Sequence, residues 1–92
     1  VELTDPEEEV NITDERFKKL SKLSKNQAEK IASDSISGKI VDREYAIENG
    51  KPVYEFDVID EKTKKEIEIE IDGITGKILE KEFEYFEVGV DS

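Results

Sequence analysis

Apolar and polar residues alternate with a period of two along most of the second half of the chain. Four segments carry this alternation: residues 39–47, 52–59, 66–72 and 77–86. The third, EIEIEID, alternates without a fault, with Ile67, Ile69 and Ile71 at one parity and acids at the other. Such alternation is typical of β-strands that bury one face and leave the other in water. The pattern therefore predicts four strands that share an apolar face.

Turn residues stand between these segments and set how the strands connect. Asn49-Gly50 is the strongest short hairpin signal, because both residues tolerate the positive φ of a type I′ turn. Short connections favour antiparallel neighbours, so we expect a meander sheet. In the other strands, the apolar residues that share a face are Val41, Tyr45 and Ile47 in the first and Tyr54, Phe56 and Val58 in the second, while Leu79, Phe83 and Tyr85 share one parity in the fourth.

The period is helical before the strands begin. Ser24 and Gln27 form a capping box, in which each side chain satisfies a backbone donor at the start of a helix. Small and apolar residues then share a narrow face suited to close packing on a sheet: Ala28, Ile31, Ala32 and Ser35. Weaker helical spacing predicts a short extra helix within residues 12–22. The fold class is α+β, with an N-terminal helix packed on a four-stranded antiparallel meander.

Residues 72–80, DGITGKILE, look more like a functional loop than any other stretch. An aspartic-protease loop needs Asp directly before Thr-Gly, but the residue before Thr75 is Ile. An EF-hand starting at Asp72 needs Glu at its twelfth position, which is Phe83, and a phosphate-binding loop needs a helix after it. We interpret the segment as a tight turn, in which Asp72 accepts backbone N–H groups and Gly76 supplies a positive φ.

The composition excludes several classes of catalytic and metal site. Apolar residues make up 35% of the 92 residues and charged residues 42%, which fits one small domain. The chain contains no Cys and no His, which excludes Cys-His and Ser-His catalysis and any metal site built on thiolates or imidazoles. No apolar run is long enough to span a membrane, so we expect no direct membrane insertion of this chain. We also expect no cofactor.

The net charge of −11 is concentrated at the N-terminus. Residues 1–15 hold seven acids and no base, which leaves 18 acids against 14 bases in the rest. We interpret residues 1–11 as a solvated acidic tail or linker; the alternative is an arm for a basic partner or for loose Ca²⁺ binding. The charge disfavours binding to nucleic acid. The acids of residues 66–72 are too far apart to converge on one ion, and we expect Lys or Arg opposite them on neighbouring strands.

Three segments together resemble the PepSY domain family: LSKNQAEKIA (Leu23–Ala32), GKIVDREYAIENGKPVYEFDVI (Gly38–Ile59) and KKEIEIEIDGITGKILEKE (Lys64–Glu82). The resemblance implies a cystatin-like α+β domain over residues 23–88 without catalytic residues. It also implies architectural roles for the recurrent positions, which are matched here by Tyr54, Asp72, Thr75, Gly76 and Lys77. PepSY domains occur in propeptides of secreted metallopeptidases and in cell-envelope proteins, so the resemblance implies an extracellular or cell-surface location, in a tethered or secreted full-length protein.

The leading functional hypothesis is a non-enzymatic module that inhibits or regulates a secreted metallopeptidase through an exposed edge strand. The candidate interaction segment is aromatic and apolar: Phe83, Tyr85, Phe86 and Val88. A homodimer formed through the same edge is a competing explanation. The alternative functions are a passive envelope or lipoprotein ectodomain that binds a small ligand or cation, and a self-associating structural domain.

Overall fold

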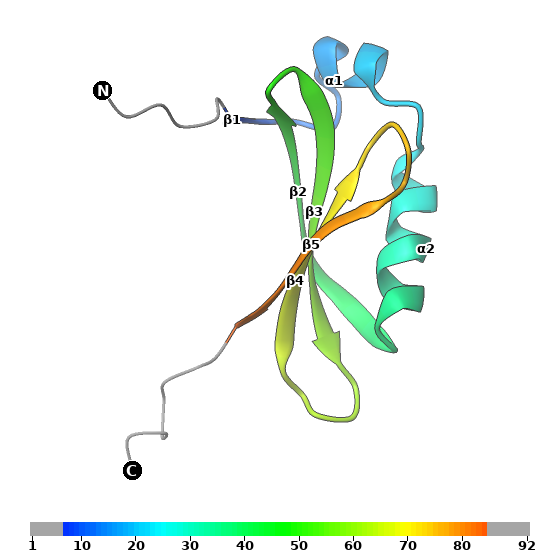
Figure 1. Cartoon of the computed structure of the whole chain (residues 1–92), viewed down its shortest axis with the longest axis vertical. Helices are drawn as coiled ribbons and strands as arrows, with labels where there is room; N and C mark the ends of the chain where they lie inside the picture. The colour runs from blue at the N-terminus through cyan, green and yellow to red at the C-terminus, as the bar shows by residue number, and fades with distance from the viewer. Residues whose placement is uncertain (1–6, 85–92) are drawn as a thin grey trace, which may run out of the picture.

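The computed structural model describes residues 7–84, which form an antiparallel sheet with both helices on one of its faces (Figure 1). The elements in chain order are β1 (Glu7–Val10), α1 (Glu15–Leu20), α2 (Lys25–Ser35), β2 (Gly38–Glu48), β3 (Lys51–Asp60), β4 (Glu66–Asp72) and β5 (Ile78–Glu84). The strands lie side by side in that same order. The α+β class and the antiparallel meander predicted from the sequence are therefore confirmed.

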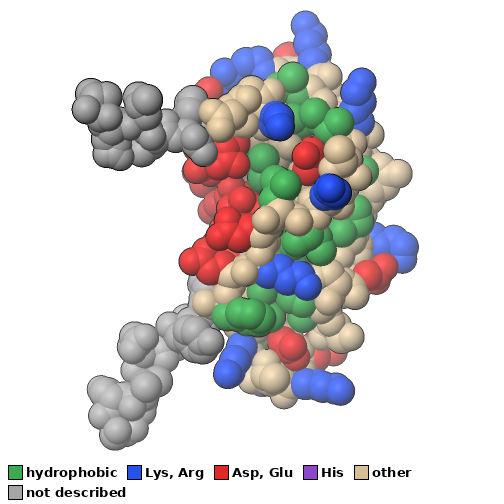
Figure 2. Space-filling view, in the orientation of Figure 1, with side chains coloured by type: hydrophobic (Ala, Val, Ile, Leu, Met, Phe, Trp, Pro, Cys, Tyr) green, Lys and Arg blue, Asp and Glu red, His purple; other side chains and the backbone are tan. Residues whose placement is uncertain are grey.

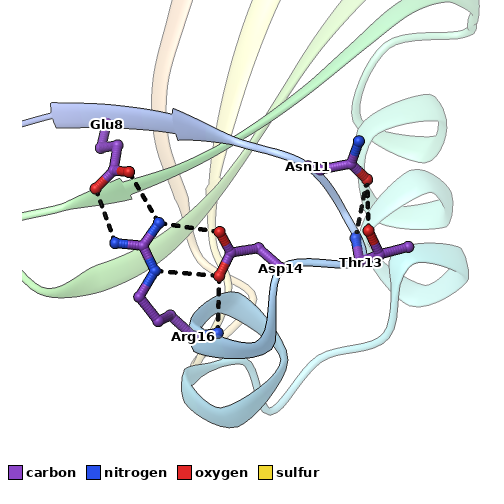
Figure 3. A network of polar contacts seen from close by, with 5 residues as sticks. All are labelled: Glu8, Asn11, Thr13, Asp14 and Arg16. Atoms are coloured by element: carbon purple, nitrogen blue, oxygen red, sulfur yellow. Dashed lines mark hydrogen bonds and ion pairs between the residues drawn. The ribbon is translucent and has the colours of Figure 1, made fainter.

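The sheet has five strands where the sequence predicted four. The additional strand β1 lies inside the segment interpreted as a tail, and it pairs with the last part of β2. Its sequence has no alternation to reveal it, since three of its four residues are Glu. The guanidinium of Arg16 at the start of α1 holds Glu8 through two hydrogen bonds of 2.8 and 3.0 Å and also binds Asp14 (Figure 3). The strand is thus anchored by charge.

Helix α2 begins with the predicted capping box, because Ser24 Oγ accepts the Gln27 N–H and Gln27 Oε1 accepts the Ser24 N–H. Its two buried residues, Ala28 and Ala32, are fully enclosed against the sheet. Small side chains allow the helix axis to approach the strands closely. The predicted short extra helix is α1, which is capped by Asp14 and buries only Phe17.

The core forms around Tyr54 on the central strand β3. Its ring packs edge-on against Phe17 at 5.2 Å and Tyr45 at 5.9 Å between ring centroids. Its hydroxyl donates a 2.7 Å hydrogen bond to the carbonyl of Leu23 and lies 3.1 Å from Ser21 Oγ. One side chain therefore joins the sheet to α1 and to the segment between the helices.

The inward-facing isoleucines predicted for β4 are buried, as are Phe56 and Val58 on β3. The prediction for Val41 is wrong: its side chain is 51% exposed. The pairing of β2 with β3 is irregular between Ile40 and Asp42, so the alternation shifts there. Such a bulge moves the next residue out of register with the buried face.

Within residues 7–84, three turns contain residues with positive φ, one of which is Lys64, with φ of 62°, between β3 and β4. Asn49 and Gly50 have φ of 53° and 77° at the β2–β3 turn, and Gly76 has φ of 81° between β4 and β5. A Cβ atom added at Gly50 meets nothing within 4 Å, whereas one at Gly76 lies 3.3 Å from Ile31 Cδ1. The β4–β5 turn therefore packs beneath helix α2, and the β2–β3 turn does not.

These contacts predict a difference between two glycine substitutions. We expect Gly76→Val to lower the free energy of unfolding by about 2–4 kcal/mol, because strain at positive φ adds to crowding against Ile31. Gly50→Val introduces only the strain and serves as the matched control. Urea unfolding of both variants measures the difference. Equal losses in the two variants would show that packing beneath α2 contributes nothing.

Candidate functional site

The sheet face opposite the helices is acidic across four strands. One row places Glu44, Glu55, Glu70 and Glu80 opposite one another on β2 to β5. The next row contains Asp42, Asp57, Glu68 and Glu82. Figure 2 shows acidic side chains gathered along the flank that faces away from α2. We call these two rows the acidic face.

The expectation that Lys or Arg would stand opposite the acids of β4 is wrong. The outward parity of every neighbouring strand also carries acids, so the register opposes Glu to Glu and Asp to Glu. A base on β2, Arg43, stands instead opposite Phe56 and binds Glu29 of α2 at 2.8 Å. Like charges directly opposite one another destabilise a sheet, so we expect repulsion on this face at neutral pH.

Burial and crowding raise the pKa of several carboxyl groups on this face. Glu55 is only 8% exposed, and burial together with a hydrogen bond shared with the carboxyl of Glu7 raises its pKa to about 8. Burial and the neighbouring Glu66 raise the pKa of Asp57 to about 6. The pKa of Glu44 is raised by a hydrogen bond shared with Glu9 and by burial. Protons shared between carboxyl groups therefore reduce the repulsion.

The acids are spread in ladders and do not converge on one point. Within residues 7–84, no group of three or more acidic side chains is arranged to hold a metal ion. Among the helices of the same part of the chain, none is long and apolar enough to cross a membrane.

Strand β5 forms one edge of the sheet and exposes apolar side chains. Phe83 is 54% exposed and Leu79 is 50% exposed. Beside Phe83 lies an open hollow of about 330 Å³, bounded by Ile36 after α2, Ile67 on β4 and Lys81 on β5. The other residues of the candidate interaction segment, Tyr85, Phe86 and Val88, lie outside the described residues.

The residues of the β4–β5 turn are occupied with shaping the backbone. Asp72 Oδ1 accepts the N–H groups of Ile74 at 2.7 Å and Thr75 at 3.3 Å. Thr75 Oγ1 in turn accepts the Lys77 N–H at 3.1 Å. The turn thus directs β5 to the edge of the sheet, and its polar atoms serve local hydrogen bonds.

Sequence reasoning missed the acidic face as a unit. Taken strand by strand, the sequence shows four acids in perfect alternation only in β4. The acidic face could be found by comparing the outward-facing positions of all the strands. Acids also occupy alternate positions on β2, at Asp42 and Glu44, and on β5, at Glu80 and Glu82. The register then brings these residues opposite each other.

The raised pKa values predict that the protein is more stable in mild acid. A carboxyl group whose pKa is higher in the folded than in the unfolded chain takes up protons on folding. The stability that such a group contributes is fully present below about pH 4, the usual pKa of a carboxyl group. It is lost as the pH rises through the folded-state pKa, which is about 6 for Asp57 and about 8 for Glu55. We expect the Tm at pH 5.5 to exceed that at pH 8.5 by about 5 °C or more.

The variant Glu55→Gln tests whether Glu55 causes the loss of stability at high pH. We expect the substitution to raise the Tm at pH 8.5 by about 4–8 °C, because it removes the buried negative charge, and to change little at pH 5.5. Glu61→Gln, in the exposed loop after β3, is the control. A Tm of Glu55→Gln that follows the wild-type pH profile would rule out Glu55 as the source.

The profile of the PepSY family, described as "Peptidase propeptide and YPEB domain", matches residues 22–82. The match begins just before the capped helix α2 and ends within β5, so it includes four of the five strands and leaves out β1 and α1. No curated protein and no solved structure matches the chain. Because the family profile covers about two thirds of the sequence, the chain belongs to the PepSY family.

Proposed function

We propose that this chain is a non-enzymatic module that binds and restrains a secreted metallopeptidase. The observation that carries the proposal is the family match, whose description names peptidase propeptides. The β5 edge supports it, since exposed apolar residues stand on a strand that has a partner on one side only among residues 7–84. On this proposal the module acts outside the cell or at its surface.

Strand addition is the mechanism that fits the β5 edge best. An extended segment pairs with an edge strand through main-chain hydrogen bonds, and its alternate side chains enter pockets on either face. At β5 the hollow beside Phe83 offers such a pocket, because Ile36 and Ile67 form part of its wall. By pairing with a strand beside the peptidase cleft, the module would block the approach of an extended substrate.

The acidic face favours a second candidate, a passive ectodomain that binds a cation or small ligand. The two rows of carboxyl groups are the observation in its favour. Binding to the folded chain would raise its Tm with ligand concentration. A Ca²⁺-dependent rise in Tm without any effect on peptidases would favour this candidate over the first.

A panel of secreted metallopeptidases tests the leading proposal by following substrate cleavage in the presence of the chain. We expect inhibition by at least one enzyme, and Phe83→Ser should weaken it about tenfold through loss of the apolar contact. Val41→Ser is the matched control, because Val41 is exposed to a similar degree but lies on β2. Absence of inhibition at tens of micromolar would reject the proposal for those enzymes.

The variant Asp72→Asn tests whether Asp72 only shapes the β4–β5 turn or also belongs to the surface that binds the peptidase. Because the amide oxygen can still accept the N–H groups of Ile74 and Thr75, we expect inhibition to stay within about twofold of wild type. Inhibition constants and circular dichroism spectra should be measured on the same preparations. Loss of inhibition in a folded Asp72→Asn variant would make the turn part of the binding surface.

A further inference from the structure

We propose that the segment that pairs with β5 carries a fixed charge pattern, complementary to both faces of this strand. The pattern is basic opposite Glu80 and Glu82, acidic opposite Lys81, and apolar opposite Phe83. The kind of partner rests on the proposed function, whereas the chemistry of the segment rests on the side chains of β5.

The two edges of the sheet differ in what they offer a partner. Strand β1 consists of Glu7, Glu8, Glu9 and Val10, and charged residues on a short edge strand discourage pairing. Strand β5 is longer and carries exposed Leu79 and Phe83. Strand addition therefore favours β5 over β1.

Side chains of β5 alternate between two unlike surroundings. Glu80 stands beside Glu70, and Glu82 beside Glu68, so these two extend the rows of the acidic face to its border. Lys81 stands beside Ile69 and Phe83 beside Ile67, on the face that carries the helices. A pairing strand places its own side chains opposite these, about 5 Å away. The pairing strand must therefore complement the acidic face with one set of side chains and the helix side with the other.

Charge complementarity then fixes the pattern of the partner. A Lys or Arg opposite Glu80 or Glu82 adds a positive charge to rows that hold only acids in β2 to β5. Another acid there lengthens a row of like charges, which is unfavourable. On the helix side, an apolar residue opposite Phe83 extends the wall of the hollow, and an acid opposite Lys81 forms an opposite-charge pair.

A second copy of this chain is the wrong occupant by the same reasoning. A closed two-fold pair of β5 strands keeps both acidic faces on the same side of a joined sheet. When such a pair is centred on Lys81, lysine opposes lysine and Glu80 opposes Glu82. The sequence of β5 is thus the charge-inverted form of the segment it selects, and self-pairing is disfavoured.

Peptide titration of the ¹⁵N-labelled full chain tests the inference without a peptidase. The probes are acetyl-Thr-Val-Lys-Glu-Lys-Val-Thr-amide and its charge-inverted counterpart, acetyl-Thr-Val-Glu-Lys-Glu-Val-Thr-amide. We expect the first to shift amide signals of β5 and to bind at least about fivefold more tightly than the second. Equal affinities, tighter binding of the inverted peptide, or no shifts in β5 would overturn the inference.

The double variant Glu80→Lys with Glu82→Lys tests the same pairs from the other side. It should fold at least as well as wild type, because it relieves repulsion on the acidic face, and we expect it to reverse the peptide preference. The variant Glu9→Lys with Glu15→Lys changes the net charge equally at exposed positions, on the opposite edge strand β1 and at the start of α1, and should keep the wild-type preference. If both double variants show the same peptide preference, the preference depends on net charge alone, and the inference is overturned.

The outcomes separate this inference from the proposed function. Peptide selectivity at β5 without inhibition of any peptidase would reject the proposed function and support the inferred chemistry. Peptidase inhibition that Glu80→Lys with Glu82→Lys leaves unchanged would reject the inference while the proposed function stands. Sedimentation of the free chain as a dimer that Phe83→Ser dissociates would reject the inference in favour of a second copy.

Discussion

The hydrogen bond from the Tyr54 hydroxyl to the carbonyl of Leu23 is the contact on which the arrangement of the rest depends. It fixes the segment between α1 and α2 against the centre of the sheet. The N–H groups of Lys22 and Leu23 in that segment both donate to the carbonyl of Gly73, at 2.9 and 3.0 Å. The same short segment therefore sets the start of α2 and the end of β4. The turn that leads into β5 begins at Gly73, so this junction also holds the start of that turn.

The helix side of the sheet is packed and the opposite side is charged. This asymmetry follows from the small size of the domain. A chain of this length buries only about 60–65% of its unfolded surface, so a second apolar layer is not available to cover the other face. Acids keep that face solvated, but four adjacent strands then oppose like charges. Stability at neutral pH is consequently a balance between the core around Tyr54 and repulsion on the acidic face. Proton sharing by carboxyl pairs such as Glu55 with Glu7 shifts that balance.

The sequence predicted those elements whose information is local. The capping box of Ser24 and Gln27, the alternation of residues 66–72 and the turn at Asn49-Gly50 each depend on a few neighbouring residues. Strand β1 could not be predicted in this way, because it is held by a guanidinium from α1 and by pairing with β2, and its own residues favour solvent. The exposure of Val41 depends on a bulge that only the register reveals. The acidic face escaped for a related reason, since opposition of charges across strands is a property of the register.

The acidic face and the β5 edge are energetically linked. A cation placed beside Glu80 makes the electrostatic potential at Glu70 more positive and so lowers the pKa of Glu70, which burial and then Glu80 raise. Binding of a basic segment at the edge would thus favour the ionised form of carboxyl groups further inside the face. By linkage, the ionised face would in turn bind that segment more tightly than the protonated face does. Repulsion that weakens the free domain as the pH rises is therefore the same free energy that a complementary partner recovers on binding.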